Sequence, residues 1–536
     1  MVFWTEFRTR SNLSFENTRP LRADFPNGGG MNPYQKIFES ARKAKVLDSI
    51  KGLLHWDQET YMPLRGIDLR AEETALMAHL VHREMTSKKF GRALSQLVDL
   101  ETGECFDDSL SFEKRAALRE WRRDYLHEVR LPPSFVKLFA KTTALAQQVW
   151  QRAKEKSDFK LFAPHLEKIV SLCRQKADYL SFNEHPYDAL LDLYEPEMTT
   201  HQITSLFGSL HIHLTALLKK ISGCGQPPSE FLHQEYEPKR QLEVGKMLLK
   251  AMGLESDSSR IDLSAHPFCL SLSPHDLRLT TRIHPENLSS NLFSVLHEGG
   301  HALYEKNLPA EHFGSPLCEG VSLGVHESQS RFWEVFIGHS HPFWEHCFPL
   351  LQREFPETLS AVSLDDFFKA INTVAPSCIR IEADEVTYCQ HILLRFEMEK
   401  ALLEGNLKVR DIPEVWNEKM RAYLGISPST DDRGCLQDIH WSLGALGYFP
   451  TYALGNLYAA QLFQAFETAF PHWKEEVKRG ALGFISSWLQ DKVHKWGRQY
   501  PPARLIQQAS GQPLSTEPFL SYLKKKYSSL YHLHRS

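Results

Sequence analysis

The stretch Asn291–Tyr304 (NLFSVLHEGGHALY) constrains the fold more than any other, because its chemistry works only on a helix. Residues four apart on an α-helix lie on one face, so His297 and His301 would present two imidazoles to a single metal ion. Glu298 is offset around the helix and could reach a metal-held water without taking a coordination position. This H-E-x-x-H spacing is typical of two zinc ligands accompanied by a general base.

The sequence around this motif favours a helix. Ser289 or Ser290 is a suitable N-cap, and an apolar stripe follows with the helical period. The stripe consists of Leu292, Phe293, Leu296 and Leu303. Gly299 and Gly300 oppose the helix, since two adjacent mid-helix glycines cost about 2 kcal/mol relative to alanine. A chain that keeps both is expected to need the bare surface, for close packing or for the approach of a substrate.

A third ligand would separate a metal site from a surface helix that merely carries two spaced histidines. Glu319–Glu334 reads as a second helix, and its Glu327 lies 26 residues after His301. A zinc site of the His₂Glu type takes its third ligand from a following helix and keeps one position for water. Glu327 is preferred because apolar neighbours would bury its helix beside the first. The competing candidates are Glu305, which continues the first helix past the site and could instead support a ligand, Glu311 and Glu319. Arg331 stands where some H-E-x-x-H enzymes carry an outer aspartate, so the outer carboxylate is left unassigned.

Helical periodicity dominates the chain from Met31 to about Lys220 and returns near the C-terminus, which predicts a mainly α fold. With 42% hydrophobic residues, the chain can bury a large core. Residues 262–282 instead alternate apolar and polar residues, which predicts a hairpin or edge strand directly before the metal helix. An extended peptide could pair with such an edge. Asp276, Arg278 and Arg282 would share one face of this strand; the alternative is an ordinary charged sheet face.

Charge and cysteine usage exclude several classes of partner. A net charge of −4 without strong charged blocks gives no electrostatic case for nucleic acid or an anionic membrane. No apolar run approaches the roughly 18 residues of a transmembrane helix. The nine cysteines are odd in number and form no C-x-x-C pair, which predicts reduced thiols and a cytoplasmic location.

Residues 1–30 differ from the rest of the chain. Their arginines are mixed with acidic residues and no apolar core follows, so they make a poor secretory signal. The segment ends in Gly28–Gly30, directly before Met31. We interpret it as a disordered tail or, preferably, as sequence upstream of a translation start at Met31. Residues 31–536 are expected to form a single domain.

Several separated stretches resemble the M32 family of metallocarboxypeptidases, the thermostable carboxypeptidase Taq type. They keep the family's order and cover nearly the whole chain from Met31. The stretches are HWDQETYMP (His55–Pro63), YEPEMTT (Tyr194–Thr200), HPF (His266–Phe268), DLRLTTR (Asp276–Arg282), HEGGHALYE (His297–Glu305), HESQS (His326–Ser330), IRIEAD (Ile379–Asp384), GCLQDIHW (Gly434–Trp441) and GYFPTYALGNLYAAQ (Gly447–Gln461). Residues 1–30 resemble nothing in the family.

The resemblance implies a large, mainly α-helical zinc-peptidase fold, with a deep substrate cleft and a small β-sheet next to the H-E-x-x-H helix. It places the metal ligands at His297, His301 and Glu327 and the catalyst at Glu298, in agreement with the spacing argument. It also implies removal of single C-terminal residues, with broad preference, from peptides that have a free C-terminus. The implied cofactor is one Zn²⁺ per chain, which Co²⁺ can replace, and the implied assembly is a homodimer.

Hydrolysis also needs a hydrogen-bond donor to the developing oxyanion. The candidates are His440, Tyr448 and Tyr452, which all lie in stretches that carry the resemblance; Tyr452 also counts as a substrate-binding candidate. Taken alone, His440 is more often a packed polar residue.

A carboxypeptidase must hold a terminal carboxylate, which arginine does best through its bidentate fork. Arg380 is the first candidate, and Arg278 with its neighbour Asp276 is the second. The alternative for each arginine is a structural ion pair, of Arg380 with Glu382 or Asp384 and of Arg278 with Asp276.

Two other functions share the same motif. A zinc oligopeptidase or dipeptidyl peptidase would use the same ligands, and a non-catalytic binding protein could retain the metal alone. Glu298 argues against the binding protein, because a purely structural zinc needs no base beside it.

Overall fold

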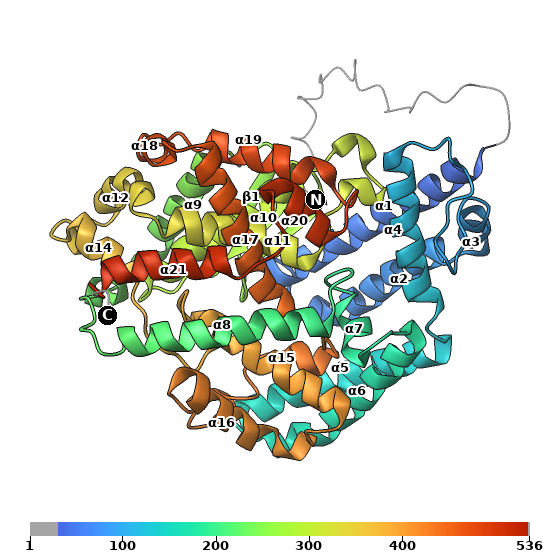
Figure 1. The fold of residues 1–536 in the computed structure, drawn as a ribbon, viewed down its shortest axis with the longest axis horizontal. Helices are drawn as coiled ribbons and strands as arrows, with labels where there is room; N and C mark the ends of the chain where they lie inside the picture. Colours follow the sequence, from blue (N-terminus) through green and yellow to red (C-terminus); the bar gives the residue numbers. More distant parts are fainter. Residues whose placement is uncertain (1–30, 534–536) are drawn as a thin grey trace, which may run out of the picture.

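The computed structural model describes residues 31–533, and helices make up most of this range (Figure 1). Residues 1–30 lie outside the described residues, so their interpretation stays a prediction. Helix α1 (Pro33–Thr60) begins at a capping box, in which Asn32 and Gln35 each accept a hydrogen bond from the other's backbone N–H. The helix ends just before Met62 and Pro63, because a proline cannot continue the helical hydrogen bonds.

The remaining helices before the sheet are α2 (Ile67–Met85), α3 (Lys88–Ser95), α4 (Phe112–Val129), α5 (Pro133–Glu155), α6 (Phe159–Leu180), α7 (Pro186–Leu191), α8 (Thr200–Ile221) and α9 (Pro238–Met252). Those after the sheet are α10 (Leu288–Lys306), α11 (Leu323–Arg331), α12 (His341–Glu354), α13 (Pro356–Leu359), α14 (Leu364–Ile371), α15 (Tyr388–Glu404), α16 (Ile412–Leu424), α17 (Pro450–Ala469), α18 (Trp473–Lys478), α19 (Gly483–Lys492), α20 (Pro502–Ser510) and α21 (Glu517–Leu530). Three shorter segments matter below: the π-helix η5 (Phe332–Gly338) and the 3₁₀ turns η6 (Arg380–Glu382) and η8 (His440–Leu443).

A three-stranded sheet forms where the sequence predicts strands. Its strands are β1 (Ser259–Leu263), β2 (Phe268–Ser273) and β3 (Asp276–Thr281), in the order β1-β3-β2. β3 is antiparallel to β2 and parallel to β1, so β3 is the central strand and β2 lies at an edge. Asp276 and Arg278 share one face of β3, whereas Arg282 lies past its end. The predicted hairpin is therefore real, but β1 completes the sheet on the other side of β3.

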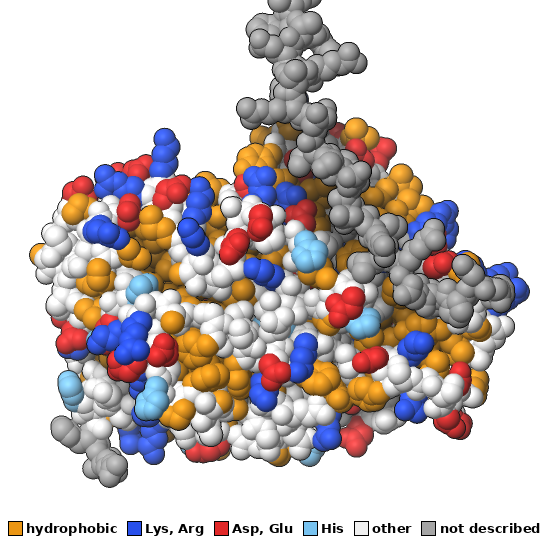
Figure 2. All heavy atoms as spheres, turned by 90° about the horizontal axis from the view of Figure 1, so that it is seen from above, with side chains coloured by type: hydrophobic (Ala, Val, Ile, Leu, Met, Phe, Trp, Pro, Cys, Tyr) orange, Lys and Arg blue, Asp and Glu red, His pale blue; other side chains and the backbone are white. Residues whose placement is uncertain are grey.

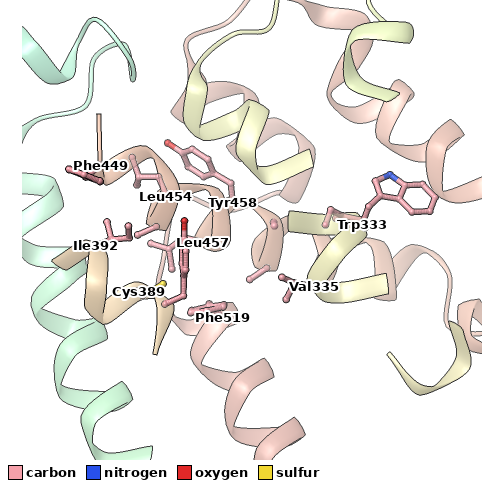
Figure 3. Close-up of a cluster of buried hydrophobic side chains, with 14 of the residues drawn as sticks. Trp333, Val335, Cys389, Ile392, Phe449, Leu454, Leu457, Tyr458 and Phe519 are labelled. Atoms are coloured by element: carbon pink, nitrogen blue, oxygen red, sulfur yellow. The ribbon is translucent and has the colours of Figure 1, made fainter. Parts of the chain in front are cut away.

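The main core spans many helices between Ala146 and Tyr527, and Figure 3 shows the part of it where α15, α17, α21 and η5 meet. Figure 3 shows Trp333 and Val335 of η5, Cys389 and Ile392 of α15 and Phe519 of α21 in this region. α17 is buried on most of its surface, which suits its run of apolar and small residues. This rigid centre supports the segments that carry the candidate site.

A smaller apolar cluster joins α1, α3 and α4. α1 connects this cluster to the sheet, because Gly52 lets the helix approach Leu270 and Leu272 of β2. A Cβ at Gly52 would meet these two side chains at 3.2–3.3 Å. Arg498 adds a polar connection, since its guanidinium binds Glu120 of α4 at 2.8 Å.

Charged side chains of both signs share the surface, and the cysteines form no disulfide among the described residues. On the face shown in Figure 2, Lys and Arg side chains are interspersed with Asp and Glu. Within residues 31–533, no helix is both long and apolar enough to cross a bilayer. All nine cysteines lie in this range and are free thiols.

Candidate active site

Helix α10 carries the H-E-x-x-H motif, and Asn287 caps its N-terminus. The Asn287 side chain accepts a hydrogen bond from the backbone N–H of Ser290 at 3.1 Å. The predicted caps Ser289 and Ser290 are therefore wrong, because the helix already begins at Leu288 and both serines lie in its first turn. The stripe packs against the core, with Leu292, Leu296 and Leu303 buried and Phe293 partly buried, and this packing offsets the cost of the glycines.

The two glycines of the motif allow close helix packing. A Cβ at Gly300 would lie 2.6 Å from the backbone oxygen of Gln329 and 2.6 Å from Cα of Ser330, both on α11. A Cβ at Gly299 would meet Met252 and Leu249 of α9, at 2.7–3.0 Å. Close packing is thus the reason for the bare surface, and Gly300 brings α11 against the motif.

His297, His301 and Glu327 form the one group of potential metal ligands found among residues 31–533, with ligand atoms within 4.8 Å of one another. The Oε2 atom of Glu327 lies 3.7 Å from Nε2 of His297 and 3.8 Å from Nε2 of His301. Bonds of about 2.0–2.1 Å in a tetrahedral site place ligand atoms roughly 3.4 Å apart. The three side chains therefore fit a zinc ion after a small closure, with one coordination position left open.

Glu334 is the outer carboxylate that the sequence could not assign. Its Oε2 atom lies 2.7 Å from Nδ1 of His297, which leaves Nε2 free to face Glu327. Glu334 belongs to η5, and the wider turn of this π-helix follows directly after α11. Arg331 donates hydrogen bonds to Oε1 of Glu327 at 2.8 Å and to Oε2 of Glu334 at 3.1 Å. It therefore connects the candidate ligand Glu327 to Glu334, which supports His297.

These carboxylates control the charge on the imidazoles. Burial lowers the pKa of His297, but Glu327 and Glu334 outweigh it and raise this pKa to about 9. Burial also raises the pKa of Glu334, but Arg331 and His297 lower it to about 2. Burial and the neighbouring His326 hold the pKa of His301 well below its usual range. His301 is thus a neutral imidazole, whereas a metal must displace a proton from His297.

Glu298 lies in the same cleft as the three candidate ligands. Its side chain is buried on α10 and lines the cleft together with His297, His301 and Glu327. Burial, assisted by the charge of Glu327, raises the pKa of Glu298 to about 7. A pKa of about 7 suits this carboxyl group to exchanging a proton near neutral pH. A bound dication would lower the pKa of Glu298 through its positive charge.

The cleft has a volume of about 880 Å³, enough for a short peptide segment. The start of β2 lines the cleft, as do Arg380, Tyr448 and Tyr452. Metal ligands and these three predicted site residues therefore meet in one cavity, although they are far apart in sequence.

Arg380 belongs to a buried group with an excess positive charge. Its Nε atom lies 3.0 Å from Oδ1 of Asp438, while Arg395 binds Oδ2 of the same carboxylate at 2.7 Å. Two guanidinium groups thus share one carboxylate, and both hold the pKa of Asp438 far below its usual value despite its burial. The ion pair is with Asp438, not with the predicted partners Glu382 or Asp384. Asp438 follows the GCLQ of a quoted stretch, but spacing alone could not pair it with Arg380.

The three oxyanion candidates lie together near Arg380. Nε2 of His440 lies 3.2 Å from the hydroxyl of Tyr452, and the Tyr448 and Tyr452 rings are 5.4 Å apart. Burial lowers the pKa of His440 to about 4, so this imidazole is neutral. Only the two tyrosines line the cleft; His440 contacts Tyr452 from behind.

Asp276 and Arg278 are not brought to this site. Within the described part of the chain, the residues that line the cleft do not include either of them. Arg278 binds Asp276 at 2.5 Å, and its guanidinium lies 4.8 Å from the ring centroid of Trp56. Their contacts agree with the alternative interpretation, a structural ion pair on the sheet. Arg282, which follows β3, does line the cleft.

A helical fold with two histidines of an H-E-x-x-H helix, a third carboxylate and a buried base defines a metallopeptidase. The family model of the carboxypeptidase Taq (M32) metallopeptidases matches residues 36–527, and the chain belongs to this family. The protein is thus a metallocarboxypeptidase, which confirms the resemblance in the sequence. The mainly α fold with its small sheet is confirmed as well.

Known relatives match over nearly their whole length. The chain is 40% identical to thermostable carboxypeptidase 1 of Thermus thermophilus, covering 93% of this chain and 99% of the relative. It is 37% identical to carboxypeptidase 1 of Bacillus subtilis, covering 94% and 99%. The crystal structure of the M32 carboxypeptidase of Deinococcus radiodurans superimposes with a TM-score of 0.90, at 35% identity, covering 93% of this chain and 99% of that one.

Proposed function

We propose that the protein is a zinc carboxypeptidase that removes single residues from the free C-terminus of peptides, with broad preference. The observation that carries this proposal is the excess positive charge at Arg380. It faces the same cleft as Glu298 and the three metal ligands. A substrate carboxylate at Arg380 would neutralise this charge and place the last peptide bond towards the metal site.

One Zn²⁺ per chain is the proposed cofactor, held by Nε2 of His297, Nε2 of His301 and Oε2 of Glu327. Nitrogen and oxygen donors in a three-ligand site with an open position suit catalytic zinc, and Co²⁺ accepts the same donors. When bound, the ion supplies a Lewis acid that makes water a nucleophile near neutral pH and polarises the scissile carbonyl.

Side chains of the cleft and their neighbours supply the other catalytic and substrate-binding roles. Glu298 takes the proton of the attacking water and later donates it to the leaving amine. Tyr448 and Tyr452 would donate hydrogen bonds to the oxyanion from their hydroxyl groups. His440 acts through Tyr452, because its neutral imidazole touches that hydroxyl. Arg380 holds the terminal carboxylate, and Asp438 fixes the orientation of its guanidinium.

Peptides that differ only at the C-terminus provide the test. A free-acid peptide and its C-terminal amide, both N-acetylated, are incubated with the zinc-loaded enzyme, and mass spectrometry identifies the products over time. We expect successive loss of single C-terminal residues from the acid and none from the amide. Equal turnover of the amide, or release of internal fragments, would instead identify an oligopeptidase. Loss of activity with a chelator and recovery with Zn²⁺ or Co²⁺ test the cofactor.

We also propose a homodimer, a cytoplasmic location and a single catalytic domain over residues 31–536. α2 has no buried residue in the described chain; its Leu69 and Leu76 are exposed, and Leu64 in the turn before it is 92% exposed. Such an apolar helix surface favours a second copy of the chain as its partner. Light scattering tests the dimer, and Leu69→Lys with Leu76→Lys should give a monomer. Free cysteines support a reducing compartment.

A further inference from the structure

The two imidazoles of the metal site have different outer partners. Nδ1 of His297 contacts the carboxylate of Glu334, whereas Nδ1 of His301 lies 2.6 Å from Nδ1 of another imidazole, His326. The opposite ring nitrogen of His326, Nε2, lies 3.0 Å from Oε1 of Glu305. His301, His326 and Glu305 thus form a chain of three groups that leads away from the ligand cluster.

Proton positions in this chain follow from the chemistry of its ends. His301 must offer an unprotonated Nε2 to a metal, so its proton resides on Nδ1 and is donated to His326. His326 then accepts at Nδ1 and carries its own proton on Nε2, which it donates to the Glu305 carboxylate. Each hydrogen bond has one donor and one acceptor in this arrangement. If both rings are neutral, no other tautomers satisfy both contacts while Nε2 of His301 stays free.

The chain also joins the two helices that supply the ligands. Glu305 lies four residues after His301 on α10, and His326 directly precedes Glu327 on α11. The two contacts therefore cross the close helix packing at Gly300. Lys45 of α1 contributes a positive charge beside this chain and lies 3.7 Å from Glu319. Burial raises the pKa of Glu305, but the hydrogen bond with His326 and the positive charge of Lys45 lower it below its usual value, so Glu305 acts as the acceptor.

We propose that His326 and Glu305 are positioning residues that hold His301 as an Nε2 ligand and slow the loss of the metal. Neither residue touches the cleft's reacting centre as a ligand; each acts through His301. The inference rests on the zinc site proposed above and extends it to residues outside the ligand set. Outer partners of metal-bound histidines usually change metal affinity by about 10–100-fold when they are removed.

Substitutions separate the hydrogen bonds from packing. His326→Leu removes both contacts while filling the space. His326→Asn keeps an acceptor oxygen close to the position of Nδ1 but loses the reach to Glu305. Glu305→Gln keeps an acceptor oxygen and removes the charge. Glu311→Gln is the matched control, because Glu311 follows the same helix but its side chain is exposed.

The readout is the rate at which the zinc-loaded, full-length protein loses zinc to an excess of a coloured chelator. We expect His326→Leu to lose zinc about 10–100-fold faster than wild type. The rates of His326→Asn and Glu305→Gln should lie between those of His326→Leu and wild type, and Glu311→Gln should lose zinc at the wild-type rate. The visible absorption of the cobalt-loaded protein should change in His326→Leu, since His301 is then free to turn.

Wild-type zinc retention in all variants would overturn the inference. Equal acceleration in His326→Leu and His326→Asn, with none in Glu305→Gln, would also overturn it, because packing alone would then explain the loss. If His326→Leu does not fold, His326→Asn and Glu305→Gln decide by the same rates. A wild-type protein that binds no stoichiometric zinc would instead contradict the proposed cofactor, which distinguishes the two failures.

Discussion

Replacing Gly300 by alanine should damage the metal site more than it damages the fold. The added Cβ would lie 2.6 Å from the Gln329 oxygen and from Cα of Ser330, and these backbone atoms cannot rotate away. Ordinary contact requires about 3.4 Å, so α10 and α11 must separate by about 0.8 Å, the difference from the observed 2.6 Å. Glu327 lies on α11 only two residues before Gln329 and three before Ser330. When α11 is pushed away, Glu327 therefore moves with it.

The size of each effect follows from this displacement. Overpacking costs about 1–3 kcal/mol, and alanine returns about 1 kcal/mol of helix propensity, so the net loss of stability is at most about 2 kcal/mol. Metal–ligand distances tolerate only about ±0.2 Å. A misplacement near 1 Å can cost about 100-fold in rate. We therefore expect a folded Gly300→Ala protein whose kcat/KM and zinc retention fall about 10–100-fold.

Gly299→Ala is the control for this experiment. Its Cβ would meet the end of the Met252 side chain at 2.7–2.8 Å, and a methionine can change rotamer. Both variants gain the same helix propensity, so only the rigidity of the neighbour differs. The measurements are urea unfolding, chelator competition and peptide hydrolysis. Wild-type zinc retention in Gly300→Ala, or an equal loss in Gly299→Ala, would refute the reasoning.

Three further predictions address the base, the carboxylate site and pH. Glu298→Gln should retain zinc by elemental analysis but lose about 10²–10⁴-fold in kcat, because the proton acceptor is gone; unchanged kcat would contradict the mechanism. Arg380→Lys keeps a positive charge for Asp438 but loses the fork, so kcat/KM for free-acid peptides should fall about 10–100-fold in steady-state assays; an unaffected KM would place the carboxylate elsewhere. Burial raises the pKa of Glu399, which accepts hydrogen bonds from Tyr187 and Trp441, to about 7. Its neutral form is therefore favoured in the folded state, and this contribution is present below the unfolded pKa near 4.5 and is lost as pH rises through 7. Glu399→Gln should gain about 3 kcal/mol relative to wild type between pH 4.5 and 8 in urea unfolding, and a pH-independent difference would speak against a raised pKa.

Local sequence patterns were sufficient to predict the fold class and the three candidate ligands. A helix repeats every 3.6 residues, so the spacing of His297 and His301 already placed both rings on one face. The helical stretch around Glu327 predicted a partner helix in the same way. Periodicity and the quoted stretches therefore predicted the helical fold, the strands before α10 and the family.

Only the tertiary structure decided which distant groups share the cleft and its surroundings. Nothing in the sequence pairs Glu334, His326 and Asp438 with their partners, because His297, His301 and Arg380 lie on other elements. Arg278 and Arg380 looked alike in sequence, yet β3 holds one beside Trp56 and η6 turns the other into the cleft. The double glycine likewise has its reason in tertiary packing, because Gly300 contacts α11 and Gly299 contacts α9. The sequence by itself determined which residue types stand at which local spacing; packing across the core determined what each of them meets, since those distances are not encoded in any single stretch.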